Sequence, residues 1–79
     1  MITTLLNAKI KELPKDFHAA VEIDGYEVMV ITEHRISVTV SKRKGPCRGS
    51  HVVIYNPNPN ITIEEVYKKA WEVLETLCA

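Results

Sequence analysis

The chain has 79 residues, of which 46% are hydrophobic and 25% charged, and this balance is that of a folded globular domain rather than a disordered segment. A chain of this length forms one domain, residues 1–79, and buries only about 60% of its unfolded surface, so we expect no deep cofactor cleft. Ten basic and ten acidic residues cancel to a net charge of zero, which excludes a protein that coats nucleic acid through its overall charge.

The first predicted element is an amphipathic helix over residues 3–13. Its apolar positions share one face at spacings of four, four and three residues: Ile2, Leu6, Ile10 and Leu13. Pro14 ends this helix, because a residue that precedes a proline is pushed away from helical geometry. About ten residues make a marginal helix in isolation, so we expect it to dock on the sheet that follows.

Residues 19–40 predict three consecutive antiparallel strands. Asp24-Gly25 lies between two β-rich runs and is a strong signal for a two-residue type I′ turn, in which both residues need positive φ. This turn sets Ile23 opposite Tyr26. Counting outward gives the remaining pairs: Val21 with Val28 and Ala19 with Val30 on one face, and Glu22 with Glu27 and Ala20 with Met29 on the other.

The third strand is predicted over residues 35–42, where apolar and polar side chains alternate. A connecting loop with an odd number of residues, three or five, is needed to place Val38 opposite Val30 and Val40 opposite Val28. A fourth short strand is predicted over residues 51–56. It is followed by a stiff connector, residues 56–60, in which two prolines disfavour helix.

The last predicted element is a helix that begins after Thr62, an N-cap that forms a capping box with Glu65, with Ile61 and Val66 as a hydrophobic staple. Its expected sheet-facing residues are Val66, Ala70, Val73 and Leu77, widened by Ile63, Tyr67, Trp71 and Leu74. We therefore expect Tyr67 and Trp71 in the core. The order α-β-β-β-β-α predicts an α+β fold, an antiparallel sheet with both helices packed on one face.

Residues 42–50 are the one strongly basic segment, with four positive charges and no acid: Lys42, Arg43, Lys44 and Arg48. These side chains, with the amides of Gly45 and Gly49, could contact the phosphates of a nucleic acid or bind a protein partner. The alternative is a solvated loop that keeps a hairpin end soluble. The segment has none of the interleaved aromatic residues that stack single-stranded bases.

Cysteine and histidine positions do not predict a catalytic or metal site. Cys47 and His51 have a usable spacing, but no second close pair completes the four ligands usual for structural zinc. Lys44 and Arg48 favour a lowered pKa for the Cys47 thiol, yet nucleophilic catalysis also needs an oxyanion site and a pocket. We expect no enzyme, no cofactor and no metal.

Acidic residues gather around the first predicted hairpin. Glu22 and Glu27 face each other across two strands, and the repulsion between their like charges costs stability. This cost suggests that the two glutamates serve to bind a partner with a basic surface. Together with Glu33 they form the candidate acidic face, for which a solvated outer surface is the alternative. Because the total charge is zero, the four positive charges of residues 42–50 imply a net charge of minus four for the rest of the chain. An uneven charge distribution of this kind can steer and orient a charged partner.

The chain shows no secretory leader at Met1-Ile2-Thr3 and no run of about 18 apolar residues. We therefore expect a soluble cytoplasmic protein that has free thiols at Cys47 and Cys78 and no contact with a membrane.

The element order resembles the layout of double-stranded-RNA-binding domains, but Glu64 and Glu65 would repel a phosphate at the start of the last helix. In size, in its lack of a catalytic motif and in its helix-flanked hairpin Val21-Glu-Ile-Asp-Gly-Tyr-Glu-Val28, the chain resembles small accessory proteins of bacteriophages and mobile elements, among them anti-CRISPR inhibitors and host-takeover factors.

That second resemblance implies a non-enzymatic inhibitor that occludes a host protein, often at a nucleic-acid-binding site, through the polar sheet face and the hairpin loops. Glu22, Glu27 and Glu33 would then stand in for phosphates. Two alternatives stay open. One is a nucleic-acid-binding domain that uses residues 42–50, and the other is a homodimer that pairs an edge strand with its symmetry mate.

Overall fold

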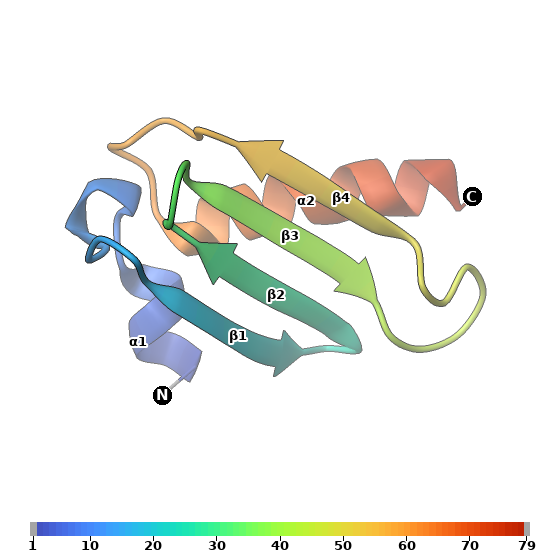
Figure 1. Ribbon diagram of the computed structural model, residues 1–79. Helices are drawn as coiled ribbons and strands as arrows, with labels where there is room; N and C mark the ends of the chain where they lie inside the picture. The colour runs from blue at the N-terminus through green and yellow to red at the C-terminus, as the bar shows by residue number, and fades with distance from the viewer. Residues whose placement is uncertain (1, 79) are drawn as a thin grey trace.

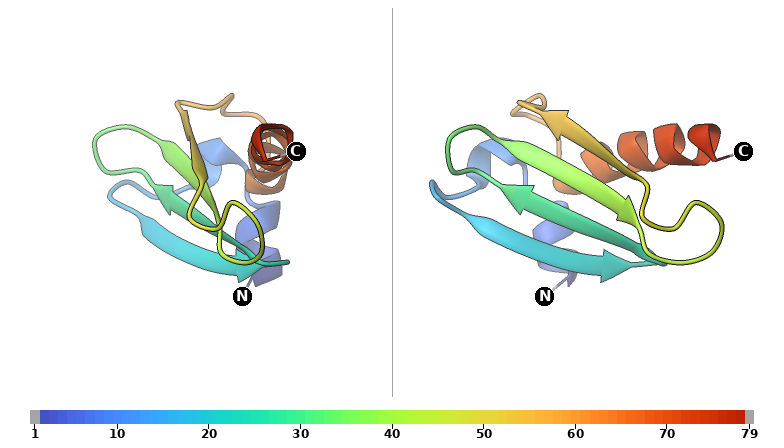
Figure 2. Two further views of the ribbon diagram at one scale, coloured as in Figure 1. Left: turned by 90° about the vertical axis from the view of Figure 1, so that its right-hand side faces the viewer. Right: turned by 45° about the vertical axis from the view of Figure 1, so that its right-hand side comes forward.

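The computed structural model describes residues 2–78, with side chains for residues 5–78, and shows an α+β fold (Figure 1). In chain order the elements are α1 (Ile2–Asn7), a 3-10 turn η1 (Ile10–Glu12), β1 (His18–Ile23), β2 (Tyr26–Ile31), β3 (Ser37–Lys42), β4 (His51–Tyr55) and α2 (Ile63–Leu77). The four strands form one antiparallel sheet in sequence order, and both helices lie on the same face of it (Figure 2). The predicted fold class is confirmed.

The β1–β2 hairpin has the predicted turn. Asp24 and Gly25 have φ values of 50° and 82°, as a type I′ turn requires. Ile23 pairs with Tyr26, and the pairs farther along the strands are those that the turn predicts. The helix-side face is therefore apolar across β1 and β2, while the Glu22 and Glu27 pair lies on the opposite, helix-free face.

The loop between β2 and β3 has five residues, 32–36, so the predicted odd number is confirmed, as are the pairs that place Val38 and Val40 on the apolar face. β3 begins at Ser37, two residues later than predicted. Thr32 explains where β2 stops, because its hydroxyl donates to the Pro14 carbonyl at 2.7 Å and accepts from the Phe17 amide at 2.8 Å. This residue thereby ties the loop to the segment before β1.

The single N-terminal helix predicted over residues 3–13 is wrong, because the segment is divided into α1 and η1 at Ala8 and Lys9. The backbone there bonds to the connector before α2 instead of continuing a helix. Ile10 donates to the Ile61 carbonyl at 2.9 Å, and Ile63 donates to the Ala8 carbonyl at 3.0 Å. Leu6 and Ile10 are buried in the core, but α1 packs chiefly beside α2 and not on the sheet as predicted.

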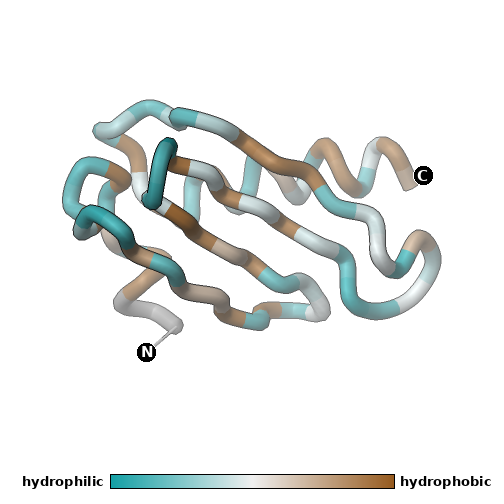
Figure 3. Tube along the Cα trace, viewed as in Figure 1, coloured by the Kyte–Doolittle hydropathy of each residue, from teal (hydrophilic) through white to brown (hydrophobic). Residues whose placement is uncertain are grey.

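The core lies between the sheet and the two helices. Its buried apolar side chains are Leu6, Ile10, Tyr26, Val28, Val30, Val38, Val40, Ile63, Val66, Tyr67, Ala70 and Leu74. Figure 3 shows the corresponding alternation of hydropathy along the strands, with hydrophilic loops at both ends of the sheet. Within residues 2–78, no helix combines the length and the apolar character needed to cross a bilayer.

α2 begins with the predicted capping box, in which the Thr62 hydroxyl accepts from the Glu65 amide at 3.2 Å. The helix packs over β3 and β4, and its C-terminal turns project past β4 in Figure 1. Three residues predicted to face the sheet are exposed instead: Trp71 by 39%, Val73 by 48% and Leu77 by 72%. The prediction was wrong for them because two strands cover only a narrow stripe of the helix.

Candidate binding groove

The predicted acidic face is only partly assembled. Glu22 and Glu27 are directly opposite each other on the helix-free face, in one cross-strand row with Ser41 and His51. Glu33 lies in the β2–β3 loop, at the other end of β2. The structure therefore brings together the first two acids and separates them from the third by the length of a strand.

The basic loop, residues 42–50, is also divided. Lys42 pairs with Tyr26 across the strands and so points to the helix side, where its ammonium lies 3.4 Å from Glu75 Oε2 and its side chain is only 14% exposed. Arg43, Lys44 and Arg48 are exposed. Lys42 is thus occupied within the fold, and three of the four predicted basic residues face solvent.

The basic loop lies beside the β1–β2 turn. The Arg43 amide donates to the Gly25 carbonyl at 2.9 Å, and the side chain of Lys44 passes 3.7 Å from where a Cβ on Gly25 would stand. A small hollow of ≈ 190 Å³ opens between Arg43, Arg48 and their neighbours. Since Glu22 and Glu27 lie at this same end of the sheet, the positive and negative groups are adjacent and not at opposite poles.

Tyr26 and Glu75 form the best-defined polar contact on the helix side. The Tyr26 hydroxyl donates to Glu75 Oε2, the same oxygen that faces Lys42. Burial, and then the hydrogen bond and charge of Glu75, raise the pKa of Tyr26 to about 12, against a smaller lowering by Trp71. The same hydrogen bond and the Lys42 ammonium lower the pKa of Glu75, although partial burial opposes them. Tyr26 is thereby held in one orientation.

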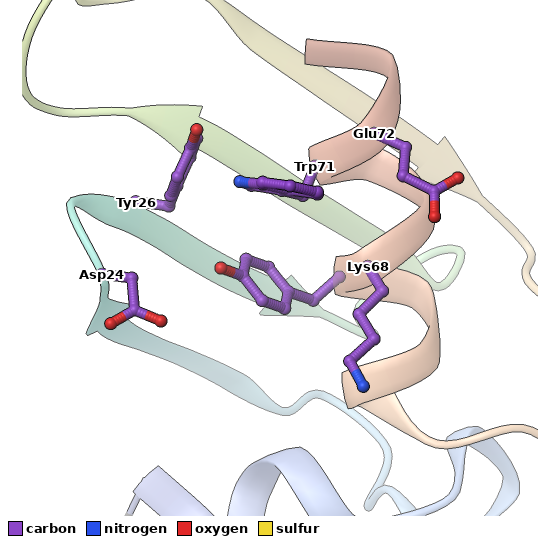
Figure 4. Close-up of a pocket in the computed structure, with 6 residues that line it drawn as sticks. Asp24, Tyr26, Lys68, Trp71 and Glu72 are labelled. Atoms are coloured by element: carbon purple, nitrogen blue, oxygen red, sulfur yellow. The ribbon is translucent and has the colours of Figure 1, made fainter. Parts of the chain in front are cut away.

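A groove opens next to this contact, between α2 and the β1–β2 hairpin (Figure 4). It has a volume of ≈ 550 Å³ and is lined by Asp24, Tyr26, Tyr67, Lys68, Trp71 and Glu72. It exists because α2 covers β3 and β4, while the helix side of β1 and β2 near the turn has no helix over it. Apolar Ile23 beside it is only partly buried.

Three aromatic rings form the walls of the groove. Tyr26 and Tyr67 meet edge to face, with ring centroids 6.4 Å apart and an interplanar angle of 69°. Trp71 stands on α2 and turns the nitrogen side of its indole toward Tyr26 in Figure 4. Burial, and after it the charge of Asp24, raise the pKa of Tyr67. Asp24 lies across the groove from α2, whereas Glu72 lines only the rim and its carboxylate points away from the rings in Figure 4.

Sequence reasoning missed this groove because it assigned both Tyr67 and Trp71 to the core. Tyr67 is buried, at 9% exposure, as predicted, whereas Trp71 is not. A signal was present in the spacing, since Tyr67, Trp71 and Glu75 recur every four residues and form a second stripe beside the core stripe. The hairpin register places Tyr26 on the face that this stripe meets.

The surroundings of the cysteines differ from those that the sequence predicts. A hydrogen bond to Cys78 is the main cause that raises the pKa of Cys47, with Lys42 acting in the opposite direction. The predicted lowering of this pKa by Lys44 and Arg48 is therefore wrong. Both thiols are free, and among residues 5–78 no group of three or more metal-ligating side chains is placed to hold an ion.

No protein-family model matches the chain, and neither curated proteins nor solved structures show a protein similar to it.

Proposed function

We propose that the protein is a non-enzymatic binding module that takes a cationic side chain of a partner protein, arginine above all, into the groove between α2 and the β1–β2 hairpin. The observation that carries this proposal is the exposed Trp71 ring set beside Tyr26 and Tyr67, with Asp24 across the groove. Tryptophan and tyrosine are the residues most enriched among those that dominate binding energy at protein interfaces.

A cation suits the groove better than a neutral group. Aromatic faces attract ammonium and guanidinium groups within about 6 Å of a ring centroid, and tryptophan does so best. Asp24 also places a carboxylate at the hairpin side of the groove, where it can pair with a positive ligand. The same fold contains one such pair, in which the Arg35 guanidinium lies 5.0 Å from the Tyr55 ring centroid.

The groove is held ready before a ligand arrives. Tyr26 is fixed by its hydrogen bond to Glu75, which Lys42 holds in turn. Tyr67 is packed into the core, so two of the three walls lose little freedom on binding. Preorganisation of this kind raises affinity, because side chains need not be ordered in the complex. A host protein as partner, and a phage origin, stay predictions from the layout of the sequence.

The proposal is tested by fluorescence anisotropy with a labelled ten-residue peptide that carries one central arginine, compared with the same peptide carrying neutral citrulline. We expect the citrulline peptide to bind about tenfold more weakly, from the loss of a cation–π contact and a charge pair. Trp71→Ala and Asp24→Asn should weaken the arginine peptide similarly, and asparagine keeps the positive φ that residue 24 needs.

The matched control is the double variant Glu22→Gln with Glu27→Gln, which removes the same kind of charge from the helix-free face. It should bind the arginine peptide like the unmodified protein. Equal binding of the arginine and citrulline peptides, or loss of binding in the control alone, would contradict the proposal.

A further inference from the structure

β4 is an edge of the sheet that lacks the usual protection against pairing. Edge strands are commonly guarded by charged side chains, prolines or bulges. The five residues of β4, His51–Tyr55, include no lysine, arginine, acid or proline, and they pair with β3 without a bulge. The other edge, β1, carries Glu22.

The exposed apolar residues of α2 lie on the side of the helix nearest this edge. Residues advance by about 100° per position around a helix, so Val73 and Leu77 stand on the flank away from Trp71. Trp71 faces the β1–β2 hairpin, and the opposite flank therefore faces the β4 side. Val73 and Leu77, 48% and 72% exposed, thus extend the apolar surface of β4 onto the helix layer.

We propose that β4 pairs antiparallel with β4 of a second copy of this chain, about a two-fold axis at Val53. This register sets Val53 opposite itself, Val52 opposite Ile54 and His51 opposite Tyr55. Val52 and Ile54, which point to the helix side, then lie opposite each other. The helix-side face of one sheet therefore continues into that of the other. No formally charged strand residues are brought face to face.

The position of the helix layer supports this pairing. α2 packs over both β3 and β4, and its C-terminal turns project past the β4 edge (Figure 1). The pairing therefore places the two copies of α2 side by side and antiparallel on the same face of the joined sheet. Val73 and Leu77 then fill the space between the helices, while the groove on the other flank stays open.

The test is the solution mass by size exclusion with light scattering at about 50 µM, where a dimer with a Kd of about 1 µM is the main species. We expect twice the 9.0 kDa of one chain. Val53→Lys should reduce the mass to that of one chain, because it sets two lysines opposite each other at the axis. Leu77→Lys should do the same from the helix layer, and as an exposed position it should leave the fold intact.

The matched control is Ala20→Lys, which places the same charge in the same cross-strand row on the opposite edge. It should retain the dimer. A wild-type protein with the mass of one chain, or a dimer that Ala20→Lys abolishes and Val53→Lys does not, would overturn the proposal. Circular dichroism of each variant identifies any that is unfolded.

Discussion

Tyr26 connects the three parts of the molecule that matter for the proposed function. Its ring belongs to the core, its edge forms a wall of the groove, and its hydroxyl bonds to Glu75 on α2. The register of the β1–β2 hairpin places Tyr26 there, because the residue that follows a type I′ turn pairs with the residue that precedes the turn. Tyr26 thus links the hairpin to α2 at the mouth of the groove.

The hydrogen bond between Tyr26 and Glu75 predicts that the free energy of unfolding depends on pH in both the acid and the alkaline range. The raised pKa of Tyr26 means that its contribution is complete below the ordinary value of 10.0 and is lost as the pH rises through about 12. The lowered pKa of Glu75 means that its contribution is present above the ordinary value of 4.5 and is lost on acidification below it.

Tyr26→Phe should therefore lower the urea midpoint at pH 7, and the gap to wild type should narrow on acidification as Glu75 loses its charge. The measurement is urea unfolding followed by circular dichroism at several pH values. A gap that is the same at pH 3 and pH 7 would show that the lost hydroxyl acts without Glu75.

Cys47 offers a second prediction for a single residue. Its hydrogen bond to Cys78 raises its pKa, and a thiol reacts with iodoacetamide only as the thiolate. Cys78→Ala should therefore increase the rate of Cys47 alkylation at pH 7.5, measured by mass spectrometry of the peptide that contains it. An unchanged rate would mean that the neighbouring Lys44 and Arg48 govern the thiol, as the sequence alone suggested.

At the level of elements, local signals predicted most of the sheet and one end of α2. The Asp24-Gly25 turn and the alternation of β3 determine register within a few residues, and the capping box at Thr62 is equally local. The division of the N-terminal helix could not be predicted in this way. It depends on backbone bonds from residues 8–11 to residues 59–63, about fifty positions away.

The extent of the apolar surface on α2 was likewise beyond sequence reasoning. The helical pattern showed which residues share a stripe, but not where the sheet beneath them ends. Val73 and Leu77 fit the pattern and are exposed, and the Glu22 and Glu27 pair was predicted while its separation from Glu33 was not. The predicted burial of Val73 and Leu77, and the predicted grouping of Glu33 with the other two acids, failed for the same reason. Each depends on where an element lies relative to strands that are distant in the sequence.

Alanine substitutions at Leu74 and Leu77, about one helical turn apart, test whether the first side chain is buried and the second exposed. Leu74→Ala removes a fully buried side chain and should cost about 2–5 kcal/mol of the free energy of unfolding. Leu77→Ala should cost less than about 0.5 kcal/mol, as exposed positions usually do. Urea unfolding at low micromolar protein, where association contributes least, measures both. Similar losses would place Leu77 in the core.

In the whole molecule, the groove and the proposed dimer edge lie on opposite flanks of α2. The groove lies toward β1 and β2, and the proposed dimer edge lies at β4, so one can be occupied without blocking the other. A dimer would present two grooves related by a two-fold axis. A partner with two suitably spaced cationic segments would then bind with an avidity above that of a single groove.

The most direct measurement of the central claim is the NMR signal of the Trp71 indole N–H, since the chain contains one tryptophan. Titration with the arginine peptide should shift this signal progressively, and the citrulline peptide should shift it far less at the same concentration. If the indole signal stays in place while the amides of Glu22 and Glu27 move, the groove is not the binding site. The helix-free face of the sheet would then take its place.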